Sequence, residues 1–448
     1  MRTRVVCAIA AAVALAGCGG GAAQSTVPIV SQAGASANAQ NAAQTPIKHV
    51  VVLLQENRTF DNIFHGYPGA HWAKYGINHF NKRVRLPELP LITPWDPAHV
   101  YEAWLIEYNG GKMNGFDLET VDQGHKPPKD FAYGYVRHKD VRVYWDLARE
   151  GVLGDETFAD HRSQTYAGHL YPIAGAAGPI DPADPDWYVA NNPIVGTSCA
   201  DKGYGEAIDI MTGATNKAYR TCFDFLTIGE VLSLHGVSWR YYVPTVERTS
   251  IVSGYASIAR VFFSKEWSNV ASPETTIFSD LRNGTLPSVS WVIPAFANSD
   301  HPGQTVPQRN GPNWIANVVN AIGESRYWND TAIIFTYDDW GGWFDDVKPR
   351  TFNYYEAGFR LPLVILSPYA RRGYVSHHVH YTGSILHFIE YVYALGSLGK
   401  SDARSDRFDD CFDFRQKPLQ YMPVTPPGSF GDMLQASHSR PPAPSLFD

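Results

Sequence analysis

Three pairs of polar side chains follow apolar runs in this sequence and could together hold a metal ion. The pairs are Glu56-Asn57 just after HVVVLL, Asp338-Asp339 after TAIIFTY, and Asp300-His301 beyond VSWVIP. Carboxylate and amide oxygens are hard ligands that suit Ca²⁺, Mg²⁺ or Mn²⁺, and they can also hold Zn²⁺ when histidine joins them. The pattern predicts a divalent-metal site with acid–base groups beside it, and it leaves the choice of ion open.

Each pair also has a simpler interpretation as a loop or turn. Asp338-Asp339 could form a solvated turn after a strand, and His301 before a proline could be an ordinary loop residue. Asn57 or Thr59 could cap a following helix. A buried pair of carboxylates, however, needs a cation or a shared proton. The occurrence of such pairs after several apolar runs favours the metal site.

The apolar runs themselves predict the scaffold that would hold these residues. The runs cover residues 49–54, 289–293, 331–337 and 361–366, and helix-like segments cover Thr227–His235, Trp314–Tyr327 and Thr382–Ala394. Short continuous apolar runs are typical of strands that are buried on both faces of a parallel sheet. Their alternation with helices predicts an α/β fold, in which ligands bind at the carboxyl ends of the strands.

Five longer segments resemble a known family. They are QENRTFDNIF, NGGKMNGF, SWVIP with SDHP, TYDDWGGWFD, and LPLVILSPYARRGYVSH with SILHFIE. They are similar to segments of the bacterial phosphoesterase family that includes haemolytic and non-haemolytic phospholipases C and a related acid phosphatase. The resemblance extends from about residue 47 to the Phe412-Asp413-Phe414 segment. It implies an alkaline-phosphatase-like three-layer α/β sandwich around a mostly parallel sheet, and a metal-bound serine or threonine nucleophile.

The resemblance also implies roles for individual residues. Glu56 and Asn57 match a pair that contacts the metal and the phosphate, and Asp338 and Asp339 match an acidic pair of metal ligands. Thr165 matches the nucleophile, which also contacts the metal. It lies four residues before His169, as the family's hydroxyl residue lies four positions before a His or Arg. Ser163 is the competing hydroxyl, and either residue could instead form a turn.

Histidines complete the expected catalytic set. By the same resemblance, His301 assists the leaving group and His99 matches a family histidine, whereas Leu105 stands where some relatives carry a second one. Two further groups have alternative interpretations. The histidines His377, His378 and His380 could form a metal cluster or lie in a solvated loop. The aromatic residues Trp340, Trp343 and Phe344 could line a headgroup pocket or belong to the core.

The N-terminus predicts export and a lipid anchor. MRTR precedes the apolar run VVCAIAAAVALAG, and Leu15-Ala16-Gly17-Cys18 resembles a bacterial lipobox, so residues 1–17 are expected to be a signal peptide and Cys18 to carry lipid. An ordinary signal peptide cut elsewhere is the alternative. Residues 18–46 would then be the lipidated cysteine and a flexible tether that places the protein on the cell envelope.

The remaining boundaries follow from composition. Residues 47–418 are expected to form the catalytic domain and 419–448 a weakly structured, proline-rich tail. Export places thiols in an oxidising compartment. Cys199 and Cys222 flank a polar, glycine-containing stretch and are expected to form a disulfide, which leaves Cys411 as an odd, buried thiol.

Composition narrows the function classes. The 448 residues are 44% hydrophobic and carry 37 basic against 44 acidic side chains, a net charge of −7. The chain has enough hydrophobic residues to form a large buried core. Its net negative charge argues against binding of nucleic acid through bulk positive charge. We expect an exported metal-dependent phosphoesterase that hydrolyses phosphodiesters, phospholipids among them, through a covalent phospho-threonine. The alternatives are an acid phosphatase on the same scaffold and a lipid-anchored protein that binds metal or solute.

Overall fold

The computed structural model describes residues 45–122, 126–178, 188–201, 203–215, 217–245, 251–303 and 310–439. The predicted signal segment, the predicted lipidation site Cys18 and nearly all of the predicted tether lie outside these residues. Within the described residues, no helix combines the length and the apolar character needed to cross a membrane.

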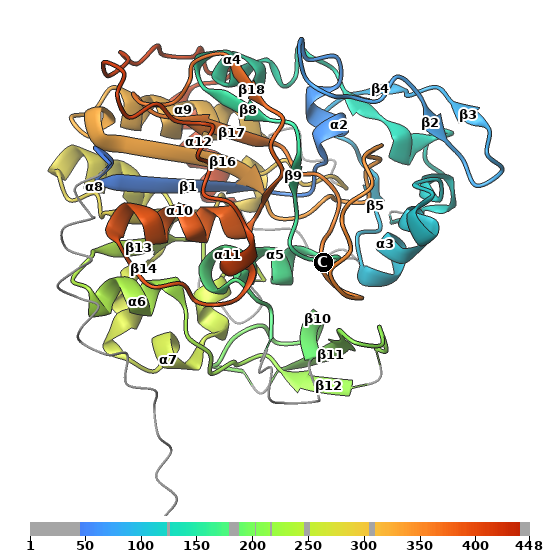
Figure 1. The fold of residues 1–448 in the computed structure, drawn as a ribbon, viewed down its shortest axis with the longest axis horizontal. Coiled ribbons are helices and arrows are strands. Elements are labelled where there is room, and N and C mark those ends of the chain that lie inside the picture. The colour runs from blue at the N-terminus through green and yellow to red at the C-terminus, as the bar shows by residue number, and fades with distance from the viewer. Residues whose placement is uncertain are drawn as a thin grey trace, which may run out of the picture.

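A central eight-stranded sheet organises the molecule (Figure 1). In spatial order its strands are β14 (Val270–Ala271), β13 (Trp239–Tyr242), β15 (Val289–Val292), β1 (His49–Gln55), β16 (Thr331–Tyr337), β17 (Leu363–Leu366), β8 (Val152–Gly154) and β18 (Tyr374–Ser376). All of them run parallel to one another except β17, which is antiparallel to both of its neighbours. The four predicted apolar runs are therefore strands of one sheet.

The side chains of each central strand alternate between two hydrophobic cores. Val50, Val52 and Leu54 of β1 belong to one core and Val51 and Leu53 to the other. The first core is completed by α5 (Thr165–Ala174), α6 (Ile228–Leu234) and α10 (Gly383–Tyr393), and the second by α4 (Arg142–Glu150), α8 (Thr276–Asn283) and α9 (Gly311–Gly323). Because helices cover both faces, the strands are apolar on both sides. The predicted three-layer α/β sandwich is confirmed.

Two of the three predicted helices have the expected bounds. Thr227 caps α6 and Thr382 precedes α10, as the sequence predicted. The helix predicted at 314–327 instead spans Gly311–Gly323. It starts early because the Asn310 side chain accepts from the Asn313 amide and a proline occupies its first turn, and the chain then turns before β16.

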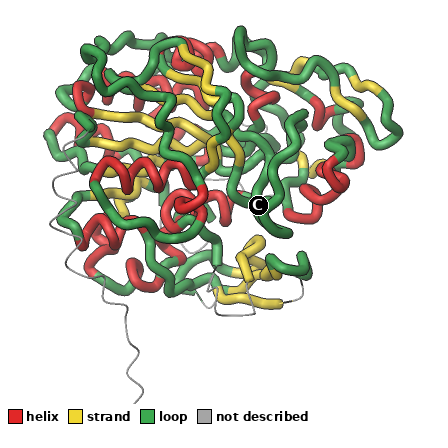
Figure 2. Tube along the Cα trace, viewed as in Figure 1, coloured by secondary structure: helices red, strands yellow, loops and turns green. Residues whose placement is uncertain are grey.

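A lobe built from residues 60–136 lies to one side of the sheet, at the right in Figures 1 and 2. It contains α2 (Phe60–Phe64), α3 (Tyr101–Tyr108) and the short strands β2 (Gly76–Ile77), β3 (Arg83–Val84), β4 (Glu88–Leu89), β5 (Asp96–Pro97), β6 (Val121–Asp122) and β7 (Tyr135–Val136). Trp340 and Phe344 join its aromatic core, and Trp343 is equally buried. These three aromatic side chains are core residues and not an open headgroup pocket.

A second, three-stranded sheet lies below α5 in Figure 1. It consists of β10 (Tyr188–Val195), β11 (Tyr204–Asp209) and β12 (Lys217–Arg220). A disulfide bond joins Cys199 to Cys222, with their Cα atoms 4.7 Å apart, as the sequence predicted. Cys411 is a buried free thiol.

The remaining elements complete the surface and the C-terminus. They are α7 (Ala259–Phe262), α11 (Ser401–Arg404), α12 (Phe430–Ser437) and the paired strands β9 (Thr157–Phe158) and β19 (His380–Tyr381). α12 contradicts the expectation of a weakly structured tail, because Met433 is fully buried in the core and its carbonyl accepts from Asn298 Nδ2. The sequence signal for this helix is the capping box formed by Ser429 and Asp432.

Candidate active site

The chain segments that follow β1 and β16 meet at the carboxyl edge of the sheet. The two strands are parallel neighbours with Gln55 beside Tyr337, so the next residues of each strand are adjacent. The Asn57 amide donates to Asp338 Oδ1 at 3.0 Å, and the Asp338 amide donates to the Gln55 carbonyl at 3.0 Å. Asn57 has φ 63°, a left-handed conformation that asparagine tolerates better than most residues. The predicted proximity of the two polar pairs is confirmed.

Helix α5 adds a histidine to these carboxylates. One ligand atom each from Glu56, His169 and Asp338 lies within 4.8 Å of the other two. His169 Nε2 is 3.3 Å from Glu56 Oε1 and 4.0 Å from Asp338 Oδ2. The close approach is possible because Gly168 has no side chain: a Cβ there would lie 2.8 Å from Asp338 Cβ.

The protonation of His169 suits metal ligation. The Tyr241 hydroxyl donates to the Val252 carbonyl at 2.8 Å, so its oxygen accepts from His169 Nδ1 at 3.4 Å. Burial lowers the pKa of His169 to about 4. The ring is therefore neutral at pH 7, with its proton on Nδ1 and the Nε2 lone pair directed at Glu56 and Asp338.

The carboxylates of the site have raised pKa values and leave buried oxygens without partners among the described residues. Burial, with the charge of Glu56 adding to it, raises the pKa of Asp338 to about 7. Burial and the charge of Asp338 raise the pKa of Asp339 well above its ordinary value. Among the described residues, the buried oxygens Asn57 Oδ1, Asp338 Oδ2 and Asp339 Oδ2 have no hydrogen-bond partner. Unpartnered oxygens beside an imidazole nitrogen are the donor set of a divalent cation, so these residues fit the implied metal.

Asp339 contributes differently from Asp338. Its Oδ1 accepts from the Gly341 amide at 2.7 Å, so only Oδ2 remains unpartnered. Gly341 has φ 62°, and a Cβ there would lie 2.3 Å from the Asn57 carbonyl oxygen. The glycine after the Asp-Asp pair is thus required for the turn that keeps both aspartates against Asn57.

The two predicted catalytic histidines lie on the other side of Asn57. Asn57 Nδ2 donates to His99 Nε2 at 3.1 Å, and His99 Nδ1 donates to the Pro97 carbonyl at 2.9 Å. The ring centroids of His99 and His301 are 5.8 Å apart. His301 Nδ1 donates to the Pro302 carbonyl at 2.8 Å, so Nε2 is the nitrogen that can exchange a proton. Leu105 lies exposed on α3.

The two candidate nucleophiles differ in their hydrogen bonds. Ser163 Oγ donates to Asn191 Oδ1 at 2.9 Å. Thr165 is the first residue of α5 and is buried, and its Oγ1 has no hydrogen-bond partner in the part of the chain that the structure describes. Because residues four apart share one face of a helix, Thr165 lies on the face that carries His169. The geometry therefore favours Thr165.

Two residues near the site had no assigned role in the sequence analysis. His169 served there only to locate Thr165, although its helical spacing from Thr165 could have indicated a shared site. His161 Nε2 donates to the Asp338 carbonyl at 3.1 Å, and burial lowers its pKa to about 4. Asp300, in contrast, is a structural residue, because Asp300 Oδ2 accepts from the hydroxyls of Tyr144 and Tyr337 at 2.7 and 2.6 Å.

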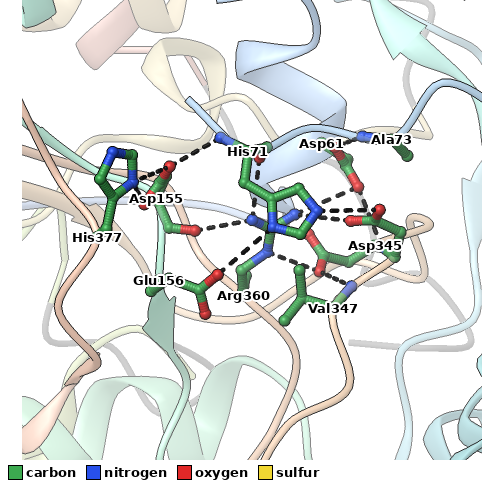
Figure 3. A network of polar contacts seen from close by, with 10 residues as sticks. Asp61, His71, Ala73, Asp155, Glu156, Asp345, Val347, Arg360 and His377 are labelled. Carbon is green, nitrogen blue, oxygen red and sulfur yellow. Dashed lines mark hydrogen bonds and ion pairs between the residues drawn. The ribbon is translucent and has the colours of Figure 1, made fainter. Parts of the chain in front are cut away.

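A second acidic cluster surrounds an arginine, whose charge offsets part of the charge of the carboxylates (Figure 3). Asp61, Asp345 and Asp346 surround Arg360, whose Nε donates to Asp345 Oδ1 at 2.8 Å and whose Nη1 donates to the Asp155 carbonyl at 2.7 Å. These carboxylates raise the pKa of Arg360. Arg360 lies just before β17 and pairs with Asp61 of the residue 60–136 lobe. These ion pairs hold the lobe against the start of β17.

Comparison with known proteins identifies the family. The model of the Phosphoesterase family matches residues 47–396. The chain belongs to this family. The phosphoesterase is thus a hydrolase of phosphoric esters, as the sequence motifs predicted.

Curated relatives and solved structures give the extent of the likeness. The phosphoesterase is 24% identical to non-specific phospholipase C6 of Arabidopsis thaliana, with 86% of this chain and 75% of the relative covered. It is 24% identical to the non-hemolytic phospholipase C of Burkholderia pseudomallei, with 83% and 59% covered. A solved alkaline phosphatase superfamily protein from Vibrio parahaemolyticus covers 81% of this chain and is itself covered to 71%, with 12% identity and a TM-score of 0.37.

Proposed function

We propose that the phosphoesterase is an exported, metal-dependent phosphodiesterase of the phospholipase C type that acts through a covalent phosphate on Thr165. One observation carries the proposal. The unpartnered Thr165 hydroxyl lies on the same face of α5 as His169, which contacts Glu56 beside Asp338. The names of the curated relatives support a phospholipid or similar diester as the substrate.

Glu56, His169 and Asp338 would hold the divalent ion, with Asn57, Asp339 and Thr165 at its side. When bound, such an ion offsets charge on the phosphoryl oxygens and makes the threonine hydroxyl more acidic. The second amide hydrogen of Asn57 Nδ2 is available to a phosphoryl oxygen, because the first is donated to His99. His99 thereby fixes the orientation of the Asn57 amide.

The proposed reaction has two displacement steps. Thr165 Oγ1 attacks phosphorus, so the Oγ1–P bond forms, the bond to the ester oxygen breaks, and the hydroxyl proton passes to water. In its doubly protonated form, His301 donates the Nε2 proton to the departing alkoxide. The hydrogen bond from its Nδ1 to the Pro302 carbonyl makes Nε2 the nitrogen that gives up this proton. Water then attacks phosphorus, the Thr165–phosphate bond breaks, and Thr165 regains a proton.

Three substrates assayed in parallel test this function. A bis-aryl phosphate and phosphatidylcholine should be hydrolysed, and a chelator should abolish both activities. Hydrolysis of an aryl monophosphate alone would identify an acid phosphatase on the same scaffold. Binding of metal without turnover of any of the three would identify a metal- or solute-binding protein and refute the proposal.

A matched pair of variants tests the nucleophile. Thr165→Ala should lose nearly all turnover and keep its fold, and Thr165→Ser should retain part of the turnover because the oxygen remains. Ser163→Ala is the control, because the Ser163 hydroxyl is already committed to Asn191. Acid quenching followed by phosphopeptide mapping should place phosphate on Thr165. Label on Ser163, or wild-type turnover in Thr165→Ala, would contradict the assignment.

Export and membrane attachment complete the proposal. The sequence Leu15-Ala16-Gly17-Cys18 and the uncharged segment that follows support lipidation at Cys18. A lipid anchor would place the enzyme at a membrane surface, where phospholipid substrate is concentrated.

A further inference from the structure

A third cluster of potential metal ligands lies beyond the end of β18. It shares no residue with the candidate active site or with the acidic cluster around Arg360. It consists of Ser376, His380, Asp410 and Cys411, and one ligand atom each from His380, Asp410 and Cys411 lies within 4.8 Å of the others. In the sheet, β18 is three strands away from β16, which corresponds to about 14 Å at the usual strand spacing. From the sequence alone, His380 is compatible with both a metal cluster and a solvated loop. His377 and His378 are exposed, but His380 is fully buried.

The three ligand atoms are spaced as the corners of a zinc tetrahedron. Cys411 Sγ is 3.9 Å from His380 Nε2 and 3.6 Å from Asp410 Oδ1, and His380 Nε2 is 3.8 Å from Asp410 Oδ1. With Zn–S of about 2.3 Å and Zn–N or Zn–O of about 2.0–2.1 Å, a tetrahedral ion separates its ligands by about 3.6 Å when sulfur is one of them and about 3.4 Å otherwise. The observed separations thus need to contract by at most about 0.4 Å.

The outer contacts of His380 are those of a metal-bound histidine. Its Nδ1 donates to Asp406 Oδ1 at 2.9 Å, and Asp406 is itself held by the Ser384 hydroxyl at 2.6 Å and the Phe408 amide at 2.8 Å. A carboxylate on the far nitrogen fixes the orientation of the ring. Ser376 Oγ donates to Asp410 Oδ2 at 2.5 Å and therefore accepts from His380 Nε2, and a bound zinc ion would replace that Nε2 proton. Ser376 Oγ, 3.0 Å from His380 Nε2, lies where a fourth ligand or a bound water would be.

We propose that His380, Asp410 and Cys411 bind a structural zinc ion that is distinct from the catalytic metal. A thiolate, an imidazole and a carboxylate together favour Zn²⁺ over Mg²⁺ or Ca²⁺, which prefer oxygen ligands. Binding transfers the Cys411 thiol proton to solvent. His380 is the first residue of β19, so the ion would join the 406–411 turn to β19 and stabilise the C-terminal part of the fold.

Metal analysis and cobalt spectroscopy on the full-length protein test this proposal. The protein loaded with Co²⁺ should show a thiolate-to-cobalt charge-transfer band in the near ultraviolet, which an oxygen-and-imidazole centre cannot produce. Cys411→Ser should lose that band and one equivalent of bound zinc while retaining chelator-sensitive turnover. Asp338→Asn should keep the band. His378→Ala, an exposed histidine on the same loop, is the matched control and should behave as wild type.

Thiol alkylation provides a readout that does not depend on the folding of a variant. In the wild-type protein, zinc should protect Cys411 from alkylation and a chelator should expose it, as read by peptide mapping. A cobalt protein without the charge-transfer band, equal zinc content in wild type and Cys411→Ser, or alkylation of Cys411 that zinc does not slow would each overturn the proposal. The hydrogen-bonded chain from Asp406 through His380 and Ser376 to Asp410 would then be the whole role of the cluster.

Discussion

Gly168→Ala should separate α5 from the metal site with the smallest change in side-chain size. A Cβ at this position would lie 2.8 Å from Asp338 Cβ and 2.9 Å from the Asp338 carbonyl oxygen. Non-bonded carbon atoms rest at about 3.5 Å or more, so the helix and the end of β16 must move apart by about 0.7 Å. That movement displaces Thr165 and His169 from Asp338, and misplacement of about 1 Å can cost about a hundredfold in rate.

We therefore expect kcat to fall by about 10- to 100-fold with a smaller change in KM. Overpacking should cost about 1–3 kcal/mol of unfolding free energy. Replacing glycine by alanine in a helix normally gains about 1 kcal/mol, so the net change should be a loss of up to about 2 kcal/mol. Steady-state kinetics and thermal unfolding measure both effects. Gly431→Ala in α12 is the control, because the atom nearest to its added methyl group is Ser429 Oγ, at an ordinary contact distance of 3.6 Å. This variant should be fully active and at least as stable as wild type. Wild-type kcat and stability in Gly168→Ala would refute the packing of α5 on Asp338.

Three further predictions concern charge and location. Asp338→Asn should lower metal content, measured by elemental analysis, together with turnover, and full occupancy with normal activity would exclude Asp338 as a ligand. Cys18→Ser should move the protein from the membrane fraction to the soluble fraction, and an unchanged soluble distribution of both proteins would exclude the anchor. Burial, with Asp402 adding to it, raises the pKa of Glu390 from its ordinary 4.5 to about 8, so folding takes up a proton between these values and stability falls as pH rises through that range. Glu390→Gln should therefore gain unfolding free energy over wild type progressively from about pH 4.5 to about pH 8 and no further above it, whereas a pH-independent difference in denaturant titrations would contradict the assignment.

The sheet and half of the site were predictable because they depend on short-range patterns. In the run HVVVLL the residues after the histidine are all apolar, and successive residues of a strand point to opposite faces. Both faces are therefore apolar, which indicates a strand covered by helices on both sides. Since β1 and β16 are parallel, the residues after each strand lie at the same edge, and the pairs beginning at Glu56 and Asp338 are adjacent as expected. This proximity follows from one rule, that the carboxyl ends of parallel strands lie at the same edge of a sheet.

Other features depend on tertiary contacts that no local pattern encodes. The antiparallel direction of β17 has no sequence signal, because its apolar run LVIL is identical in kind to those of the parallel strands. The proposed ligand role of His169 depends on the closeness of α5 to Asp338, which a single glycine permits. The fully buried Arg360 and His380 resemble surface residues in sequence, and only their aspartate partners from distant segments explain their burial.

The position of β1 has a consequence for the order in which the enzyme can be made. Its Val50 lies between Val289 and Ala332, so the first strand to be synthesised waits for partners that are roughly 240 and 280 residues later in the chain. Until then both edges of a strand with five consecutive apolar residues, Val50 to Leu54, are unpaired, which makes folding slow and the nascent chain prone to aggregation. Glu56 likewise cannot meet Asp338 before β16 has been added. Capture of a metal by the proposed site would therefore be a late event in biogenesis, and a chain cut before residue 331 would be an aggregation-prone fragment and not a smaller enzyme.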